Sequence, residues 1–289
     1  MGERWIDRPR VARLRRRFVS VDISLRVADN YSRHRTGRNA SLLAYFGFLS
    51  VFPLILALTA VLGFVLQNRE DLRKKIINSA LNKLPIVGQT IGTDPAALRG
   101  NTGVLVVGLV LAIWSAMRAF VVLQTALDDV RELTDDERCS FVRSKVKAFV
   151  AIVVVGGSQV ATVAIHTVTT AVHITWLYQL LLLISGVAIN TAILALSYRE
   201  LCSVRAPWRE VFPGAFLGGV AFSVLQALST SLVARSLAHA SFVYGTFASV
   251  IALIWWLGLH STAALVGAEV NHALVTPGPG RRRSARLAE

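Results

Sequence analysis

Residues 242–273 read FVYGTFASVIALIWWLGLHSTAALVGAEVNHA, and this stretch decides the class of the protein. Almost all of its residues are apolar or small. An α-helix rises about 1.5 Å per residue and the hydrocarbon core of a bilayer is about 30 Å thick, so this segment is long enough to cross a membrane. Tyr244, Trp255 and Trp256 supply aromatic rings, and Glu269 places an acid next to hydrocarbon. We therefore expect a transmembrane helix here.

The composition of the whole chain agrees with this expectation. Of its 289 residues, 54% are hydrophobic and 17% are charged, and the mean hydropathy is +0.54. No Pro/Gly/Ser-rich linker divides the chain, and apolar segments recur to its end. The composition therefore predicts an all-α integral membrane protein with one membrane domain.

Five further apolar segments precede the opening stretch, so we expect a six-helix transmembrane bundle. They lie at residues 40–66, 102–125, 148–172, 177–198 and 211–234. The predicted organisation is a basic interfacial or cytoplasmic helix at 1–39, a six-span domain at 40–275 and a basic, disordered cytoplasmic tail at 276–289. Pro53 and Pro213 lie in the first and fifth segments, where proline weakens the helix ladder. They are hinge candidates, with static helix shape as the alternative.

Two amphipathic stretches flank the first span. Residues 8–34 carry an apolar stripe surrounded by arginine, which is typical of a helix lying among anionic headgroups. The alternative is a basic helix packed on the protein's own cytoplasmic face. Residues 69–85 are too polar to span, and we expect a short helix on the opposite surface. Membrane lipids with anionic headgroups are therefore the expected partners.

The distribution of positive charge predicts the orientation. With six spans, 23 Lys and Arg residues fall on the side of the termini and 7 on the other side. Positive residues concentrate on the cytoplasmic side of membrane proteins. We therefore expect a multi-pass protein of the bacterial cytoplasmic (inner) membrane with both termini inside. Cys139 and Cys202 then face the cytoplasm, where no structural disulfide is expected.

Polar side chains inside the spans are the strongest functional signal, because they are costly in hydrocarbon and face a bundle interior or a wet cavity. Arg118 is placed to approach Glu269 and neutralise it. Each such residue has two open interpretations, a structural bond between helices or a place on a transport pathway. Four glycines, Gly218, Gly219, Gly258 and Gly267, are expected to be helix contacts. The candidate polar residues are Arg118, Gln159, His166, Asn190, Gln226, His260, Glu269 and Asn271.

The sequence offers little for catalysis. The six histidines are scattered, with no HxH or HxxxH pair, and no Walker A loop, nucleophile elbow or cysteine metal motif occurs. We expect no catalytic residue, cofactor or metal, and no nucleic acid as partner. One acidic cluster lies beside Arg131 and Arg138, and we interpret it as a solvated loop, with cation binding as the alternative. Its members are Asp128, Asp129, Glu132, Asp135, Asp136 and Glu137.

Several stretches together resemble the YihY/BrkB family of bacterial inner-membrane proteins. They are ASLLAYFGFLSVFPLIL in the first span, Trp114–Ser115 with LQTALDD in the second, APWREVFPGAFLGG before the fifth, and YGTFASVIALIWWLGLHSTAALVGAEVN in the sixth. The resemblance covers residues 20–275 and implies a six-helix bundle in the cytoplasmic membrane. The family has carried ribonuclease BN and virulence-factor labels and is described as transporter-like. Asp128, Phe247 and Arg118 depart from its usual pattern.

Three functions from different classes follow from these patterns. The first is a transporter or flippase-like protein for an anionic or amphiphilic solute, including a lipid-linked one. The alternative is a non-catalytic scaffold that organises the envelope and docks partners on its basic ends. The third, which the scattered histidines disfavour, is ribonuclease BN-like tRNA processing.

Overall fold

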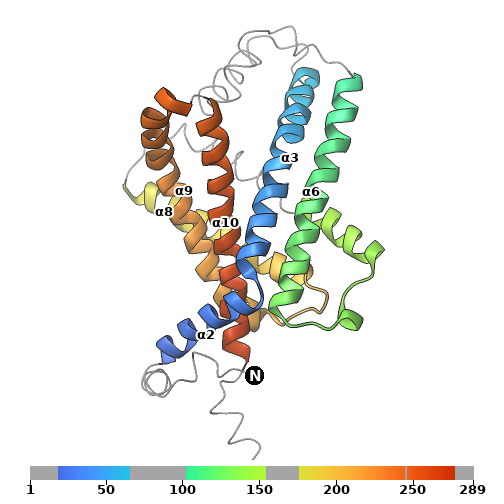
Figure 1. Ribbon diagram of the computed structural model, residues 1–289, viewed down its shortest axis with the longest axis vertical. Helices are drawn as coiled ribbons and strands as arrows, with labels where there is room; N and C mark the ends of the chain where they lie inside the picture. Colours follow the sequence, from blue (N-terminus) through green and yellow to red (C-terminus); the bar gives the residue numbers. More distant parts are fainter. Residues whose placement is uncertain (1–18, 66–101, 154–175, 245, 277–289) are drawn as a thin grey trace, which may run out of the picture. The chain divides into compact units, whose positions relative to one another are not determined.

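The computed structural model describes residues 19–65, 102–153, 176–244 and 246–276. All regular structure in these ranges is helical, and they contain no strand (Figure 1), so the predicted all-α class is confirmed for this part of the chain. A 3-10 turn, η3, and helical residues 141–153 follow α6. The elements are α2 (Val19–Arg33), α3 (Thr36–Val65), α6 (Thr102–Val130), η3 (Asp135–Glu137), α8 (Trp176–Glu200), α9 (Trp208–Tyr244) and α10 (Thr246–Val275).

Three described helical segments are long and apolar enough to cross a membrane, and they coincide with the predicted second, fifth and sixth spans. Helices α3 and α8, of 30 and 25 residues, cover the predicted first and fourth spans. Most of the predicted third span, 148–172, lies outside the described residues. The count of six crossings therefore stays a prediction. The three segments are Val106–Val130, Trp208–Leu228 and Val250–Val275.

Many large apolar side chains on these helices face outward. Val110, Trp114, Phe212 and Trp255 are each between 54% and 59% exposed. In water, exposing apolar surface costs about 25 cal/mol per Å². Lipid tails remove that cost because they are as apolar as the side chains. The outer surface of the helices therefore suits hydrocarbon.

The chain divides into two compact units. Unit 1 comprises residues 1–43, 120–229 and 258–289, and unit 2 comprises residues 44–119 and 230–257. Unit 2 contains the part of α3 around Pro53, and α3 continues as a helix through this proline. Ser50 Oγ donates to the Gly47 carbonyl at 2.6 Å, in the turn before the hinge candidate Pro53.

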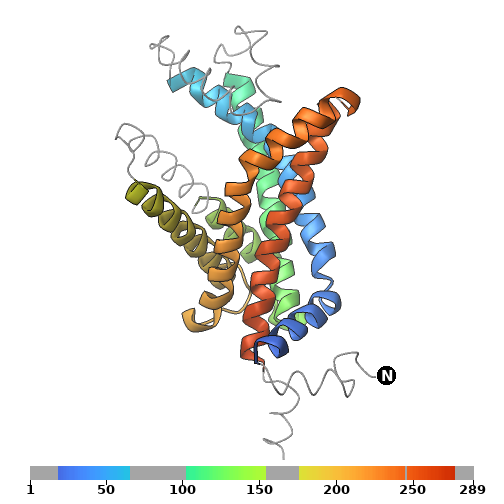
Figure 2. The same ribbon diagram turned by 90° about the vertical axis from the view of Figure 1, so that its left-hand side faces the viewer.

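Small residues let the helices of unit 1 approach each other closely. A Cβ built on Gly214 of α9 would lie 1.9 Å from the Gly267 carbonyl oxygen of α10, and one on Gly267 would lie 2.6 Å from the Gly214 oxygen. The first half of α9 and the second half of α10 are therefore in backbone contact (Figure 2). Side chains larger than glycine would force these helices apart.

The predicted glycine contacts are confirmed at three of four positions. Gly267 is one. A Cβ on Gly218 would meet Leu194 at 2.8 Å, and one on Gly219 would meet Thr191 at 2.3 Å, so α9 also packs closely on α8. The prediction is wrong for Gly258 within the described residues, because none of their heavy atoms other than its own helix backbone and chain neighbours lies within 4 Å of a Cβ placed there.

The predicted fifth span ends at residue 234 and the sixth begins at residue 242, but the break between them is wrong. Helix α9 continues through residues 235–241 to Tyr244, and α10 begins at Thr246 rather than at residue 242. The reason is local. The segment from Val220 to Tyr244 contains neither glycine nor proline, so no residue in it favours a break in the helix.

Helix α2 is the described part of the predicted amphipathic helix at 8–34, whose first residues lie outside the described ranges. It lies across the end of α10 (Figure 1), and Arg26 Nη1 donates to the Thr276 carbonyl at 2.6 Å. Arg26 also forms an ion pair with Asp22 at 3.0 Å, one helical turn earlier. The described part of the helix thus packs on the protein itself, as in the alternative interpretation, while its contact with lipid stays a prediction.

Candidate functional site

Among the charged side chains of unit 1 that the structure describes, the most deeply buried is Glu269 in the last turns of α10. It is 0% exposed. His34 Nδ1 lies 3.0 and 3.1 Å from its two carboxylate oxygens, and Thr36 Oγ1 donates to one of them at 2.6 Å. A buried carboxylate is tolerated only when hydrogen bonds replace the lost water. Glu269 therefore requires both partners from the N-terminal segment.

A tight connection between α2 and α3 delivers these partners. The backbone turns at His34 and Arg35, and Arg35 adopts a positive φ of 54°. The Asn39 amide then bonds to the Arg35 carbonyl at 3.2 Å as α3 begins. The left-handed conformation of a residue with a side chain is uncommon. It places His34 and Thr36 on the same side of the turn, facing Glu269.

The C-terminal end of α6 brings a second carboxylate to the same place. Glu132 has a positive φ of 55°. Its amide bonds to the Asp129 carbonyl and the Leu133 amide bonds to the Asp128 carbonyl, both at 3.1 Å. This is the Schellman pattern, in which the left-handed position is usually glycine. A glutamate in this position strains the backbone and projects a carboxylate toward His34.

The side chains of α2, α6 and α10 meet around that carboxylate. Glu132 Oε1 lies 3.3 Å from His34 Nε2 and accepts a hydrogen bond from Arg33 Nη2. The ring of His272 on α10 packs edge-on against the ring of His34, with centroids 5.5 Å apart. His34, Glu132 and His272 each offer a ligand atom within 4.8 Å of the others. Folding thus joins two histidines that lie far apart in the sequence.

The acidic cluster at the end of α6 is not a uniformly solvated loop. Asp128 is 3% exposed and accepts bonds from the Ser203 amide at 2.8 Å, the Ser203 hydroxyl at 2.7 Å and Cys202 Sγ at 3.3 Å. The solvated interpretation is wrong for this residue, because a buried carboxylate here anchors the turn between α8 and α9. Asp129 binds Arg138 at 2.8 Å and Asn39 at 3.1 Å.

Cys202 has no nucleophilic character in this environment. It is fully buried, and burial together with the neighbouring Asp128 charge raises the pKa of its thiol to about 11. The thiolate is the reactive form of cysteine. Cys202 and Cys139 are both free thiols.

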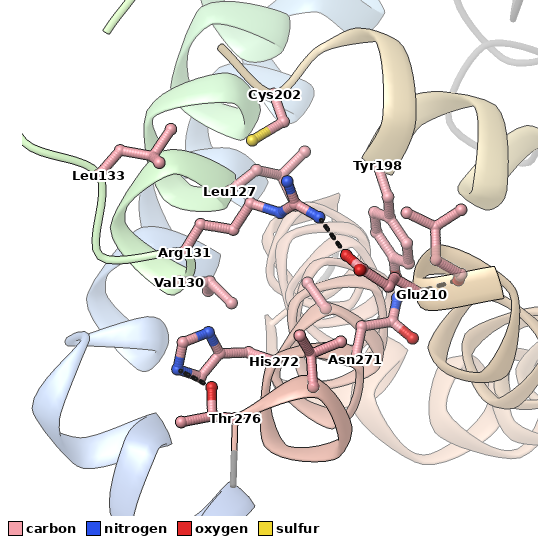
Figure 3. Close-up of a pocket in the computed structure, with 13 residues that line it drawn as sticks. Leu127, Val130, Arg131, Leu133, Tyr198, Cys202, Glu210, Asn271, His272 and Thr276 are labelled. Carbon is pink, nitrogen blue, oxygen red and sulfur yellow. Dashed lines mark hydrogen bonds and ion pairs between the residues drawn. The ribbon is translucent and has the colours of Figure 1, made fainter. Parts of the chain in front are cut away.

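A cavity of about 300 Å³ opens beside this network (Figure 3). Arg131 and Glu210 face each other across it at 3.7 Å, and Arg131 Nη1 also donates to the Val204 carbonyl at 3.1 Å. His272 Nε2 lies 3.3 Å from Thr276 Oγ1 at its edge. Most of the remaining lining is apolar. The lining residues are Leu127, Val130, Arg131, Leu133, Tyr198, Cys202, Glu210, Val211, Ala268, Asn271, His272, Val275 and Thr276.

Asn271 is the second predicted residue that lies at this site. Its Nδ2 donates to the Val211 carbonyl at 2.9 Å and its Oδ1 accepts from the Gly214 amide at 2.6 Å. These backbone groups lie in the first two turns of α9, on either side of Pro213. Asn271 therefore fixes the start of α9 to α10, close to Pro213.

The other predicted residues lie elsewhere. Asn190 is buried and donates to Ser223 at 3.1 Å and to Gln226 at 3.3 Å, which joins α8 to α9. The ring of His260 packs edge-on against Phe222, with centroids 4.7 Å apart. Gln159 and His166 lie outside the described residues.

Arg118 is exposed and belongs to unit 2. Its guanidinium lies 5.4 Å from the ring centroid of Trp114, one turn earlier in α6. We expected it to neutralise Glu269, whose oxygens are bound by His34 and Thr36. Whether Arg118 lies on a pathway stays a prediction.

Sequence reasoning missed most of the site. His34 and Thr36 stand in a basic stretch, and Glu132 and Asp128 in a charged one, where nothing distinguishes them from solvated residues. The available signal was Glu269 itself, because an acid in an apolar helix demands a partner. Its partner comes from 235 positions away, so the pairing becomes visible only with the fold.

These observations define an integral membrane protein of helices whose buried polar groups gather at helix ends. The chain belongs to the BrkB family, since the family model described as Virulence factor BrkB matches residues 27–288. The resemblance found in the sequence is thereby confirmed.

Three relatives carry this similarity. The chain is 24% identical to a UPF0761 membrane protein of Alkalilimnicola ehrlichii, over 92% of this chain and 61% of that protein. It is 24% identical to the inner membrane protein YhjD of Escherichia coli, over 71% of this chain and 67% of that protein. It is 22% identical to YfkH of Bacillus subtilis, whose name calls it ribonuclease-like, over 85% and 92%. No solved structure matches the chain.

Proposed function

We propose that this chain is a transporter or flippase-like protein of the cytoplasmic membrane that moves an anionic or amphiphilic solute. The cavity beside α10 is the observation that supports this most. It combines an apolar lining with the Arg131–Glu210 ion pair, His272 and the hydroxyl of Thr276. An amphiphile whose anionic head replaces Glu210 at Arg131 matches this combination, since guanidinium groups bind phosphate and carboxylate in a bidentate manner.

The placement of the cavity supports the same proposal. Its lining comes from the ends of α6, α8, α9 and α10, next to segments that suit hydrocarbon. The connector between α8 and α9 is among the positively charged stretches that we expect in the cytoplasm. A headgroup from the inner leaflet could reach Arg131 while its tails stay beside apolar helices.

The test is flux in proteoliposomes. Purified protein is reconstituted with labelled anionic lipids or encapsulated anionic solutes, and movement across the bilayer is compared with protein-free vesicles. Arg131→Ala should slow transport about tenfold, because a hydrogen bond to a charged group contributes about 1.5–3 kcal/mol. Arg143→Ala is the matched control, since Arg143 is exposed and does not line the cavity. Equal flux for protein-containing and protein-free vesicles, across every anionic lipid and solute, would refute the proposal.

Two predicted pathway residues complete the experiment. Arg118→Ala and Glu269→Gln should each reduce flux if these residues act in transport. Full flux in both variants would mean that Arg118 and Glu269 have structural roles only. Arg131 would then be the one residue that supports the transport proposal.

The ribonuclease-like name of YfkH belongs to that protein. Within the acidic cluster at the end of α6, Asp128 and Asp129 are the residues whose change would test such chemistry. Their bonds to Ser203, Cys202, Arg138 and Asn39 support a structural role instead. We therefore keep transport as the proposed function.

A further inference from the structure

We propose that His34, Glu132 and His272 bind a divalent transition-metal ion at the meeting point of α2, α6 and α10. One ligand atom from each residue lies within 4.8 Å of the others. His34 directly follows α2, Glu132 follows α6 and His272 lies in α10, so a bound ion would link helix ends that the chain connects only over long distances. This inference does not depend on the proposed transport function.

The distances fit a metal centre. Two donor atoms that are each about 2 Å from a tetrahedral zinc ion lie roughly 3.3 Å apart. His34 Nε2 and Glu132 Oε1 are separated by 3.3 Å. The widest pair, at up to 4.8 Å, would close by about 1.5 Å on binding, given the same zinc geometry. Because His34 and Glu132 are already at 3.3 Å, this closure requires movement of the His272 side chain, with adjustment of Glu132, which is 48% exposed.

Glu269 prepares His34 for metal binding. His34 Nε2 lies 3.3 Å from both the Arg33 guanidinium, a donor, and the Glu132 carboxylate, an acceptor, and binding a metal ion through Nε2 requires the neutral tautomer with its lone pair there. The proton is then on Nδ1, which donates to Glu269. A histidine whose second nitrogen is held by a carboxylate is the usual arrangement behind a metal ligand, because it fixes the tautomer and raises the basicity of the ring.

The backbone at Glu132 supports the same inference. In this tautomer the His34 lone pair and the Glu132 carboxylate, 3.3 Å apart, repel each other unless a cation lies near both. Arg33 supplies that cation by binding Glu132, and its side chain is 41% exposed. A divalent ion would take the place of the guanidinium. The left-handed backbone of Glu132 therefore holds a carboxylate where glycine would be less strained.

The ligand set defines the class of metal. Two imidazoles with one carboxylate suit Zn²⁺, Fe²⁺ or Mn²⁺ and leave coordination positions open for water. Mg²⁺ and Ca²⁺ prefer oxygen ligands alone. We therefore choose Zn²⁺ as the probe of affinity and Co²⁺ as the spectroscopic probe.

The experiment measures metal bound by the full chain, purified in detergent without a polyhistidine tag. After chelation and dialysis against Zn²⁺, elemental analysis should find about one ion per chain, and Co²⁺ should give visible absorption bands. Glu132→Gln and His272→Gln should each weaken Zn²⁺ binding at least tenfold, because outer-shell changes alone cost 10–100-fold. Asp136→Asn is the control, since Asp136 is exposed and lies four residues from Glu132.

A further variant distinguishes loss of a metal ligand from misfolding of the protein. Arg33→Ala removes the competing cation and should tighten Zn²⁺ binding several-fold, a gain that a damaged protein cannot produce. Absence of Zn²⁺ from the parent chain at micromolar metal would overturn the proposal. So would unchanged affinity in both Glu132→Gln and His272→Gln, or weaker binding in Arg33→Ala protein that elutes from size exclusion like the parent.

Discussion

At the residue scale, the molecule is organised by buried polar groups that find partners far away in sequence. The Glu269 carboxylate is hydrogen-bonded to His34 and Thr36. The Asp128 carboxylate is hydrogen-bonded to Ser203 and Cys202. In each case an acid in a helix is matched by groups in a connecting turn. The sequence predicted that Glu269 needs a partner but pointed to Arg118 instead of His34 and Thr36, because a long-range pair depends on topology rather than on local pattern.

Removing the buried acid should destabilise the protein strongly. Glu269→Ala leaves the His34 ring and the Thr36 hydroxyl without their acceptor, and breaking a buried pair costs about 3–5 kcal/mol. Glu269→Gln keeps an acceptor for Thr36 and should cost about half as much. Thermal unfolding in detergent measures both. Equal melting temperatures for the parent and Glu269→Ala would contradict this account of the network.

The Cys202 thiol predicts a dependence of stability on pH. Its pKa is raised from 9.0 to about 11, so the folded state favours the neutral thiol. The resulting stability is fully present below pH 9 and is lost as the pH rises from 9 to 11. Cys202→Ala should flatten the stability profile in this window, while Cys139→Ser should leave it unchanged. A parent profile that already lacks this decline would contradict the prediction.

At the element scale, helix ends and close helix contacts determine how the segments pack. The apolar periodicity predicted the existence of most helices, and α3, α6 and α8 begin or end within a few residues of the expected positions. It failed where α9 continues through residues 235–241, because a few polar residues do not interrupt a helix that lacks glycine and proline. It could not locate the left-handed positions Arg35 and Glu132, since neither residue type favours that conformation.

Two variants at the C-terminal cap of α6 separate the effect of backbone strain at residue 132 from the effect of its carboxylate. Glu132→Gly and Glu132→Ala both remove the carboxylate, but only glycine accepts the positive φ without strain. The glycine variant should therefore be more stable than the alanine variant by about 1 kcal/mol. Denaturation of the two proteins side by side gives this difference. The reverse order would show that the left-handed cap is not formed.

The contact between α9 and α10 predicts a contrast among glycines. Gly214→Ala and Gly267→Ala would drive a methyl group against the facing backbone, and overpacking costs about 1–3 kcal/mol. Gly258→Ala should be neutral or slightly stabilising, because the space around Gly258 is open and alanine favours helix. Melting temperatures of the three variants test this. A decrease in melting temperature for Gly258→Ala equal to that for Gly214→Ala would refute the helix packing described here.

At the scale of the whole molecule, the apolar exterior and the buried polar groups have opposite roles. The exterior fits hydrocarbon, and membership in the BrkB family agrees with a membrane protein. Composition alone predicted this class. The cavity could not be predicted, because its lining combines residues from the ends of four helices whose packing the sequence does not encode locally.

The proposed orientation has its own measurement. With positive charge concentrated on the side of the termini, both ends of the chain should lie in the cytoplasm. Reporter tags at residue 1 and after residue 289 should be protected from protease in intact cells and cleaved after lysis. Cleavage of either tag in intact cells would contradict an even number of crossings with both ends inside.

The central claim is that the cavity beside α10 holds the anionic head of an amphiphile, and photo-crosslinking tests it most directly. A photoreactive anionic lipid is added to membranes containing the protein, and labelled peptides are mapped by mass spectrometry. We predict label on the segments that carry Arg131, Asn271 and Thr276, and its loss in Arg131→Ala but not in Arg143→Ala. Label confined to outward-facing residues such as Phe141 and Phe212, unchanged by Arg131→Ala, would contradict the claim.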